Sequence, residues 1–444
     1  MTEPEPAARP SFREASRLWA EVAIHSFGGP AGQIAVMHRL LVEKHGWVSE
    51  SRFLHALNYC MLLPGPEAQQ LATYIGWLLH RAPGGLVAGT LFVLPGFLSI
   101  LALSVLYASY QETRLIQALF FGIKAAVIAV VIEAVLRIGK RALKNEVMVT
   151  LTVLAFLAIF FFKVPFPLIV LGAGTIGYLG GKVRLDKFYV VKGHEMKEPI
   201  DPPTRPDPRR TLRVIALWLV IWLLPLGLLV LALGRGHVLV QEGLFFSQAA
   251  LVTFGGAYAV LAYIAQRAVE TYGWLEPGEM LDGLGMAETT PGPLIQVIAF
   301  VGFLGAYRHP AGMDPLVAGV LGSIVTTWVT YAPSFLWIFA GAPYIEYLRG
   351  QKSLTTALSA ITAAVVGVIL NLAVWFSLYT LFGSVRESDW GPVHLTIPEW
   401  HTLDPVALAI AAGAMIAMLR FHVGMLPTLA VSGLLGAVAF WWRG

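Results

Sequence analysis

The fold is decided by two matching stretches of sequence, FGGPAGQIAVMHRLLVEKHGW from Phe27 and FGGAYAVLAYIAQRAVETYGW from Phe254. They lie 227 positions apart, and the same offset holds without a gap as far as Ala72 and Ala299. Fifteen of these 46 aligned positions are identical, whereas unrelated sequences of ordinary composition would share roughly three. The identical positions include Pro-Gly-Pro at 64–66 and 291–293. The chain therefore contains two related halves.

The composition indicates that the solvent of this chain is a lipid bilayer. Of its 444 residues 57% are hydrophobic and only 13% are charged, and the mean hydropathy is +0.68. A soluble domain carries about 25% charged residues, so this chain could not cover its surface with polar groups in water. The single cysteine, Cys60, excludes an internal disulfide framework and a cysteine-based metal site. No apolar stretch with a cleavage site follows the polar residues 1–10, so we expect no cleaved signal peptide.

The apolar segments predict an all-α polytopic membrane protein, because about 20 apolar residues are needed to cross the hydrocarbon core. Thirteen transmembrane segments are predicted, six in each half and one between them. They are 15–38, 53–80, 85–110, 115–137, 146–162, 164–182, 212–233, 244–266, 280–304, 314–340, 354–382, 403–420 and 423–442. We expect three parts: an N-terminal transporter half at 1–182, a cytoplasmic linker plus an inverting helix at 183–243, and a C-terminal transporter half at 244–444.

The basic residues of the loops predict the orientation. With the N-terminus in the cytoplasm, 21 Lys and Arg residues lie inside and nine lie outside, as the positive-inside rule requires. This places a multi-pass protein in the cytoplasmic (inner) membrane with its C-terminus outside. The proline-rich, charged stretch 183–211 is then a solvated cytoplasmic loop, and its charge needs no nucleic-acid partner to explain it.

The number of segments predicts that the two halves are inverted. Seven crossings separate the first segment from its equivalent, the eighth, and an odd number makes the second half enter the membrane from the opposite side. Inverted repeats of this kind occur in several secondary transporter folds. The unpaired segment at 212–233 is the inverting helix. The inference depends on the count being odd.

The Pro-Gly-Pro motifs predict broken helices at membrane depth. Two prolines around a glycine cannot continue a helix, and irregular backbone in a bilayer survives only inside protein or along a wet cavity. A new helix that starts there presents free amides and a positive dipole end, which suit an anion. Gln69 and Gln296, one turn further on, can add side-chain amides, whereas Glu67 could hold a proton or pair with a base. Simple kinks remain an alternative.

Other polar groups extend the candidate site. The Gly-Gly pairs permit either close helix contact or open backbone, and Lys124 within an apolar span either acts on the anion or is paired structurally. Packing or hydrogen bonding is the simpler role for His25, Asn58 and Asp282. The candidate substrate-binding residues are Gly28, Gly29, Gln33, Asn58, Pro64, Gly65, Pro66, Glu67, Gln69, Gln70, Lys124, Gly255, Gly256, Thr289, Thr290, Pro291, Gly292, Pro293 and Gln296.

These motifs resemble a known family across nearly the whole chain. The blocks FGGPAGQIAVMH, GWVSESRFLHALNYCMLLPGPEAQQLATYIGWLLH, ETTPGPLIQVIAFVGF and GAPYIEYLRG are similar to the chromate ion transporter (CHR) family in its long, two-halved form. The resemblance implies export of chromate from the cytoplasm and chromate resistance, with sulfate as a competing or exchanged oxyanion. It implies no catalytic residue, metal or cofactor. A homodimer is compatible with it.

Three other functions are kept beside this one. The chain could carry sulfate or another inorganic anion, with chromate only a mimic, or it could be a passive anion channel. A membrane enzyme is disfavoured, because the sequence contains no H-E-x-x-H, no G-x-S-x-G and no phosphate-binding loop.

Overall fold

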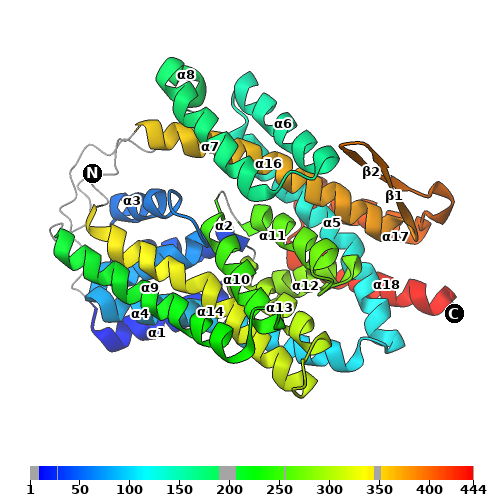
Figure 1. The fold of residues 1–444 in the computed structure, drawn as a ribbon, viewed down its shortest axis with the longest axis horizontal. Coiled ribbons are helices and arrows are strands. Elements are labelled where there is room, and N and C mark those ends of the chain that lie inside the picture. Colours follow the sequence, from blue (N-terminus) through cyan, green and yellow to red (C-terminus); the bar gives the residue numbers. More distant parts are fainter. Residues whose placement is uncertain (1–9, 28, 190–206, 255–256, 345–351, 444) are drawn as a thin grey trace. The chain divides into compact units, whose positions relative to one another are not determined.

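The computed structural model describes residues 10–27, 29–189, 207–254, 257–344 and 352–443, and these are mostly helical (Figure 1). The first half contains α1 (Phe12–His25), α2 (Gly29–His38), α3 (Glu50–Cys60), α4 (Glu67–Tyr110), α5 (Arg114–Ala142), α6 (Glu146–Phe162) and α7 (Phe166–Val183). The short α8 (Leu185–Phe188) and α9 (Pro208–Leu233) follow. The second half contains α10 (Val238–Leu251), α11 (Ala257–Gln266), α12 (Pro277–Thr289), α13 (Val297–Arg308), α14 (Pro315–Gly341), α16 (Lys352–Leu381), α17 (Pro405–Phe421) and α18 (Met425–Arg443).

The sequence repeat is also a repeat of structural elements. The π-helical turn η1 (Arg39–Lys44) after α2 has a counterpart η2 (Arg267–Thr271) after α11. Further along, α5 and α16 begin at residues 114 and 352, α6 and α17 at 146 and 405, and α7 and α18 at 166 and 425. The offset therefore grows from 227 to 238 and then to 259. Among the described helices of more than four residues, α9 has no partner in this series, and its role as an inverting helix stays a prediction.

Seven helices among the described residues are long and apolar enough to cross a membrane. They are Glu67–Tyr110, Arg114–Ala142, Phe166–Val183, Pro208–Leu233, Pro315–Tyr344, Ser353–Leu381 and Met425–Trp442. Shorter apolar helices are Glu146–Phe162, Val238–Leu251, Leu294–Arg308 and Pro405–Phe421. Many leucines of α9 are exposed, Leu231 by 84%, as suits a helix in lipid. The chain is therefore an all-α membrane protein.

Several predicted segments consist of two helices. Segment 15–38 is α1 and α2, and segment 244–266 is α10 and α11, with both breaks at the Phe-Gly-Gly motifs. The described glycine there, Gly29, has a φ of 72° and no atom within 4 Å of a built Cβ, so it provides open backbone rather than close helix contact. Helix α4 has non-helical backbone at His80 and Arg81, where the predicted segment 53–80 ends and before the segment 85–110 begins.

The helices form two compact units, each built from both halves. Unit 1 comprises Met1–Leu101, Lys192–Gly256 and Thr290–Gln351, and unit 2 comprises Ala102–Val191, Ala257–Thr289 and Lys352–Gly444. Helix α4 therefore begins in unit 1 and ends in unit 2. The core of unit 1 contains large side chains of α1, α3, α4 and α14: Trp19, Phe53, Tyr59, Trp77, Phe92, Phe335 and Phe339.

Unit 2 is held by close helix packing. Helix α16 packs against α5, α6 and α7 (Figure 1), and the Thr152 hydroxyl of α6 donates to the Ala363 carbonyl of α16 at 2.7 Å. Small residues allow backbones to approach: a Cβ built on Gly122 of α5 would lie 1.9 Å from the Ser432 carbonyl oxygen of α18.

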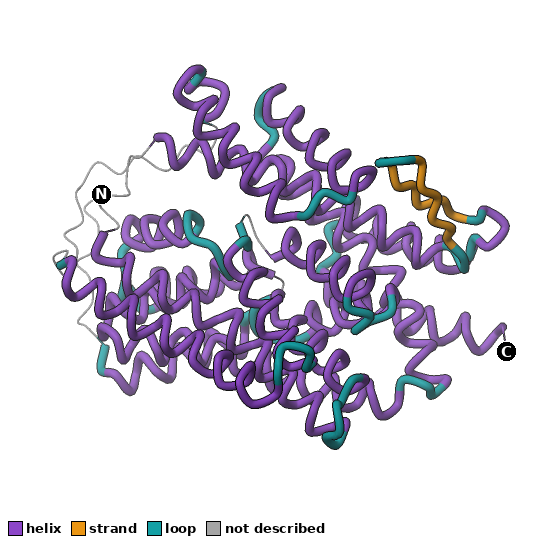
Figure 2. The backbone as a smooth tube through the Cα atoms, viewed as in Figure 1, coloured by secondary structure: helices purple, strands orange, loops and turns teal. Residues whose placement is uncertain are grey.

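A β-hairpin accounts for the last growth of the offset, and the sequence did not predict it. Strands β1 (Val385–Trp390) and β2 (Val393–Pro398) pair antiparallel between α16 and α17 (Figure 2). Gly391 in the turn has a φ of 61°. The hairpin is polar, so a search for apolar segments passes over it.

Candidate functional site

Both Pro-Gly-Pro motifs break the helix, as the sequence predicts. Helix α3 ends at Cys60 and α4 begins at Glu67, while α12 ends at Thr289 and a 3₁₀ turn η3 (Leu294–Gln296) leads into α13. The central glycine of each turn has a positive φ, 122° at Gly65 and 105° at Gly292. This left-handed region favours glycine.

Each turn is fastened to the opposite half by a main-chain hydrogen bond. The Gly65 amide donates to the Thr253 carbonyl oxygen at 2.8 Å, and the Gly292 amide donates to the Ser26 carbonyl oxygen at 2.8 Å. All four residues belong to unit 1. Both donors and both acceptors are related by the offset of 227, so the two bonds are equivalents in the repeat. The two halves therefore contact each other reciprocally at these turns.

The contacts behind the turns are reciprocal as well. A Cβ built on Gly65 would lie 2.8 Å from the Ser334 hydroxyl of α14, and one built on Gly96 of α4 would lie 2.7 Å from the Pro291 carbonyl oxygen. Gly96 and Ser334 occupy equivalent positions of the repeat, at the later offset of 238. Each turn is thus backed by a long helix of the other half.

Two glutamines of the first half orient carbonyls of these turns. The Gln33 side-chain amide donates to the Gly292 carbonyl oxygen at 2.6 Å, and that of Gln70 donates to the Pro64 carbonyl oxygen at 2.7 Å. Both side chains are buried, and their Oε1 atoms have no partner among the described residues. Gln33 and Gln70 are candidate substrate-binding residues, yet one side-chain N–H group of each holds a carbonyl of a turn and is therefore not available to the anion.

The repeated glutamines Gln69 and Gln296 are buried at the start of the new helices. Gln69 Nε2 donates to the Thr73 hydroxyl at 3.1 Å, and Gln296 Nε2 donates to the Thr327 hydroxyl at 3.1 Å. Each amide has a second N–H, and each Oε1 is buried without a partner in the described part of the chain. Buried amides are usually satisfied, so this pair is a candidate for contact with a ligand.

Replacing Gly65 with alanine is expected to destabilise unit 1 by about 2 kcal/mol, since the left-handed backbone would carry a side chain. The new Cβ would also lie 2.8 Å from Gln70 Nε2. The measurement is the melting temperature of purified protein in detergent. Gly172→Ala is the matched control, because nothing lies within 4 Å of its Cβ. Equal melting temperatures for the two variants would contradict the strain at Gly65.

The remaining candidates are distributed over both units. Asn58 on α3 and Glu67 at the start of α4 are half-buried in unit 1, and Thr290 is buried there. Thr289 belongs to unit 2, where its hydroxyl donates to the Gly285 and Met286 carbonyl oxygens. Gly28, Gly255 and Gly256 lie outside the described residues.

Lys124 lies in unit 2 and is paired. Its Nζ is 3.1 Å from Asp282 Oδ2, and the Tyr107 hydroxyl donates to the same oxygen at 2.7 Å. Lys124 therefore forms the structural pair that was one of the two alternatives for it, and its partner is Asp282.

Sequence reasoning missed several buried polar groups. The main-chain carbonyl oxygens of Ser26 and Thr253 cannot be recognised from the sequence, because every residue type has one. Glu242 of α10 is fully buried and both its carboxylate oxygens lack partners in the described structure. It lies just before the predicted segment 244–266, so the apolar window excluded it. In unit 2 the buried Glu288 accepts a hydrogen bond from the Tyr258 hydroxyl.

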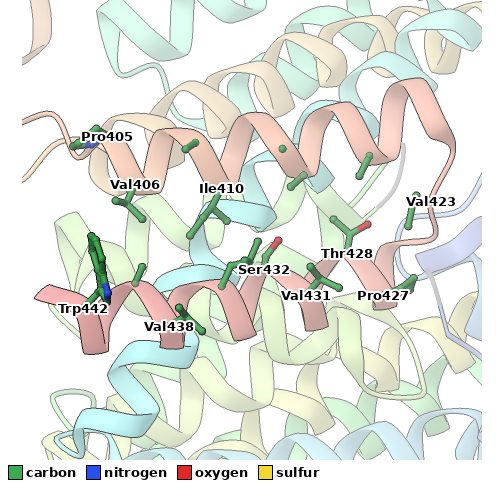
Figure 3. A pocket seen from close by; sticks show the side chains of 16 residues that line it. Pro405, Val406, Ile410, Val423, Pro427, Thr428, Val431, Ser432, Val438 and Trp442 are labelled. Atoms are coloured by element: carbon green, nitrogen blue, oxygen red, sulfur yellow. The ribbon is translucent and has the colours of Figure 1, made fainter.

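A hollow between α17 and α18 does not suit an oxyanion. It has a volume of about 920 Å³, and its lining side chains are apolar apart from Thr428 and Ser432 (Figure 3). The Thr428 hydroxyl already donates to the Gly424 carbonyl oxygen. A dianion there would find no charge and few donors.

A duplicated helical membrane protein with paired broken helices is of the class in which secondary transporters occur. The comparisons with known proteins specify this: the chain belongs to the chromate transporter family, whose model matches residues 14–178 and 240–437. A chromate transport protein of Pseudomonas aeruginosa is 32% identical, covering 81% of this chain and 79% of its own. One from Cupriavidus metallidurans is 26% identical (82% of each chain), and the "Probable chromate transport protein" of Synechococcus elongatus is 27% identical (82% and 84%). No solved structure matches the chain.

Proposed function

We propose that the protein is a secondary transporter that exports chromate across the cytoplasmic membrane, with sulfate as a competing or exchanged oxyanion. The observation that carries the proposal is the pair of equivalent Pro-Gly-Pro turns in unit 1, each starting a new helix beside a buried glutamine. Membership of the chromate transporter family and the names of the relatives support the choice of chromate.

The start of each new helix offers donors of the kind a tetrahedral oxyanion needs. The first helical hydrogen bond of α4 runs from the Gln70 amide to the Pro66 carbonyl oxygen, so the amides of Ala68 and Gln69 precede the helical ladder. In the second half the Gln296 amide donates to the Pro293 carbonyl oxygen. Neutral amides and the positive helix end bind an anion without a fixed counter-charge, which favours release on the far side. Gln69 and Gln296 supply further N–H groups.

Alternating access follows from the proposed inverted topology, with the N-terminus in the cytoplasm and the C-terminus outside. In transporters built from inverted repeats, the substrate site stays near the midplane while one body rocks against the other. The equivalence of the Gly65 and Gly292 hydrogen bonds supports such an exchange, because each half can take the conformation of the other at little cost in free energy.

Replacing Gln69 and Gln296 together with alanine is expected to lower chromate uptake into everted membrane vesicles by about a hundredfold, since two charge-assisted hydrogen bonds of roughly 1.5 kcal/mol each are lost. The affinity for chromate should fall by a larger factor than the amount of the variant protein in the membrane. Gln117→Ala removes an exposed glutamine of α5 and is the matched control. Unchanged uptake in the double variant would overturn the site.

The same vesicles test the function against its alternatives. Saturable uptake of labelled chromate that sulfate inhibits supports the proposal. Tight sulfate transport with chromate as a weak inhibitor would favour a sulfate transporter, for which chromate is only a mimic. Uptake that neither saturates nor exchanges would overturn secondary transport in favour of a channel.

A further inference from the structure

Unit 2 contains a buried ion pair with an additional hydroxyl donor. Lys124 of α5 and Asp282 of α12 are joined at 3.1 Å, and Tyr107, in the last turns of α4, donates to the same carboxylate oxygen at 2.7 Å. The other oxygen, Asp282 Oδ1, is buried and has no partner among the described residues. The carboxylate is therefore held from one side only and has an oxygen to which a proton can add.

The charges around Asp282 are few. Glu279 lies one turn earlier on α12, where its carboxylate accepts from the Glu276 amide at 2.8 Å. Helices α16 and α18 also pack on α12, but α16 has its only charged residue at its first position and α18 at its last. Helix α5 also packs on α12 and carries Glu133 and Arg137, but these two pair with each other at 3.3 Å. Lys124 is the cation that forms an ion pair with Asp282 among the described residues.

The two partners differ in their access to solvent. The Lys124 side chain is 29% exposed, whereas that of Asp282 is 2% exposed. A built Cβ on Gly278 would lie 3.0 Å from Lys124 Nζ, so the absence of a side chain there leaves the ammonium uncovered. An ion pair buried in a membrane protein is costly, and ionisable residues in an apolar span such as that of Lys124 commonly mark ion or proton pathways.

One proton changes the charge of the pair completely. With Asp282 ionised, the ammonium and the carboxylate cancel. When a proton adds to the carboxylate, Asp282 becomes neutral, Lys124 keeps its charge, and the pair becomes singly positive. An anion is then favoured in the protein by the Coulomb energy of that charge. Loss of the proton restores the neutral pair and favours release of the anion.

The chain itself connects this pair to both Pro-Gly-Pro turns. Asp282 lies on α12, which runs directly into the second turn at Thr290-Pro291. Tyr107 lies on α4, the helix that starts at the first turn. A change in the hydrogen bonds of Asp282 therefore acts on α12, which leads into the second turn, and on α4, which begins at the first turn.

We propose that Asp282, with Lys124 as its counter-charge, is the proton-binding site that couples oxyanion movement to proton movement in the same direction. The proposal rests on the proposed function and adds the coupling ion to it. One carboxylate carries one proton, so a dianion crosses with one net negative charge. Outward movement of that charge still gains about 2.3 kcal/mol per 100 mV of inside-negative potential, which is compatible with export.

The test uses purified full-length protein in proteoliposomes with the membrane potential clamped to zero. At alkaline pH, where chromate is a dianion, an outside-acid gradient of about one pH unit should accumulate labelled chromate about tenfold if one proton accompanies each anion. Asp282→Asn should abolish this accumulation while labelled chromate still exchanges against unlabelled chromate. Asp282→Glu should restore it. Glu387→Gln breaks the exposed pair with Lys163, 3.4 Å apart, and should leave accumulation unchanged.

Each outcome decides between the two proposals. Tenfold accumulation by Asp282→Asn would overturn the proton site and leave the transport function standing. So would a wild-type protein that exchanges chromate but ignores the pH gradient. A wild-type protein without saturable exchange would overturn the function itself. If Asp282→Asn does not fold, Lys124→Gln/Asp282→Asn removes both charges, and the same criterion applies to it.

Discussion

Replacing Lys124 alone with glutamine is expected to destabilise the protein by about 3 kcal/mol, because removing one partner leaves an uncompensated buried charge. Asp282 would keep only the Tyr107 hydroxyl as a donor, with its side chain 2% exposed. The measurement is the melting temperature in detergent, together with the fraction of protein that is monodisperse on size-exclusion chromatography.

The double variant Lys124→Gln/Asp282→Asn distinguishes the loss of both charges from the loss of one. Because it buries two neutral amides instead of one charge, it should recover most of the lost stability. Lys163→Gln is the control, since it breaks an exposed pair that is worth at most about 1 kcal/mol. If the double variant is less stable than Lys124→Gln, the pairing of the two side chains does not determine the stability.

Replacing Gly122 with valine is expected to prevent folding of unit 2, at a cost above about 3 kcal/mol. The new side chain would begin 1.9 Å from the Ser432 carbonyl oxygen and 3.0 Å from the Gly436 Cα, so α5 and α18 would have to separate. Backbone atoms cannot rotate away as a flexible side chain can. Loss of the monodisperse peak in fluorescence-detected size-exclusion chromatography checks the expectation.

Gly413→Val on α17 is the matched control, because nothing lies within 4 Å of its built Cβ. A normal chromatographic profile for Gly122→Val would mean that α5 and α18 do not approach as closely as described.

The helix breaks could be predicted because the residues that cause them are local. Proline lacks the amide that a helix needs, and Gly65 and Gly292 adopt a φ that other residues avoid. The repeat could be predicted for the same reason, since identical residues at a constant offset need no knowledge of the fold. The breaks at Phe-Gly-Gly were left as one of two alternatives, because a glycine pair fits both.

What holds the turns in place could not be predicted. The acceptors for Gly65 and Gly292 are carbonyl oxygens of Thr253 and Ser26, and every residue has a carbonyl. Gln33 was recognised as polar, but its partner, the Gly292 carbonyl, lies 259 residues away. Only the packing of helices from opposite halves brings these atoms together.

The partner of Lys124 and the buried Glu242 show two further limits. A lysine in an apolar span predicts that an acid lies near it, yet the choice of Asp282 depends on how α5 and α12 are rotated about their axes. Glu242 was lost for a simpler reason, because α10 begins at Val238, earlier than the apolar window did. A hydropathy window finds the apolar part of a helix and not its ends.

The crossed hydrogen bonds at Gly65 and Gly292 have a consequence for gene architecture. If the first half were synthesised alone, the Gly65 amide would lack its acceptor and the Ser26 carbonyl would lack its donor. A bilayer core offers no water to replace these partners. Such a half could complete these bonds only with a second polypeptide. Joining both halves in one reading frame, with α9 between them, fixes their stoichiometry at one to one and removes the concentration dependence of assembly.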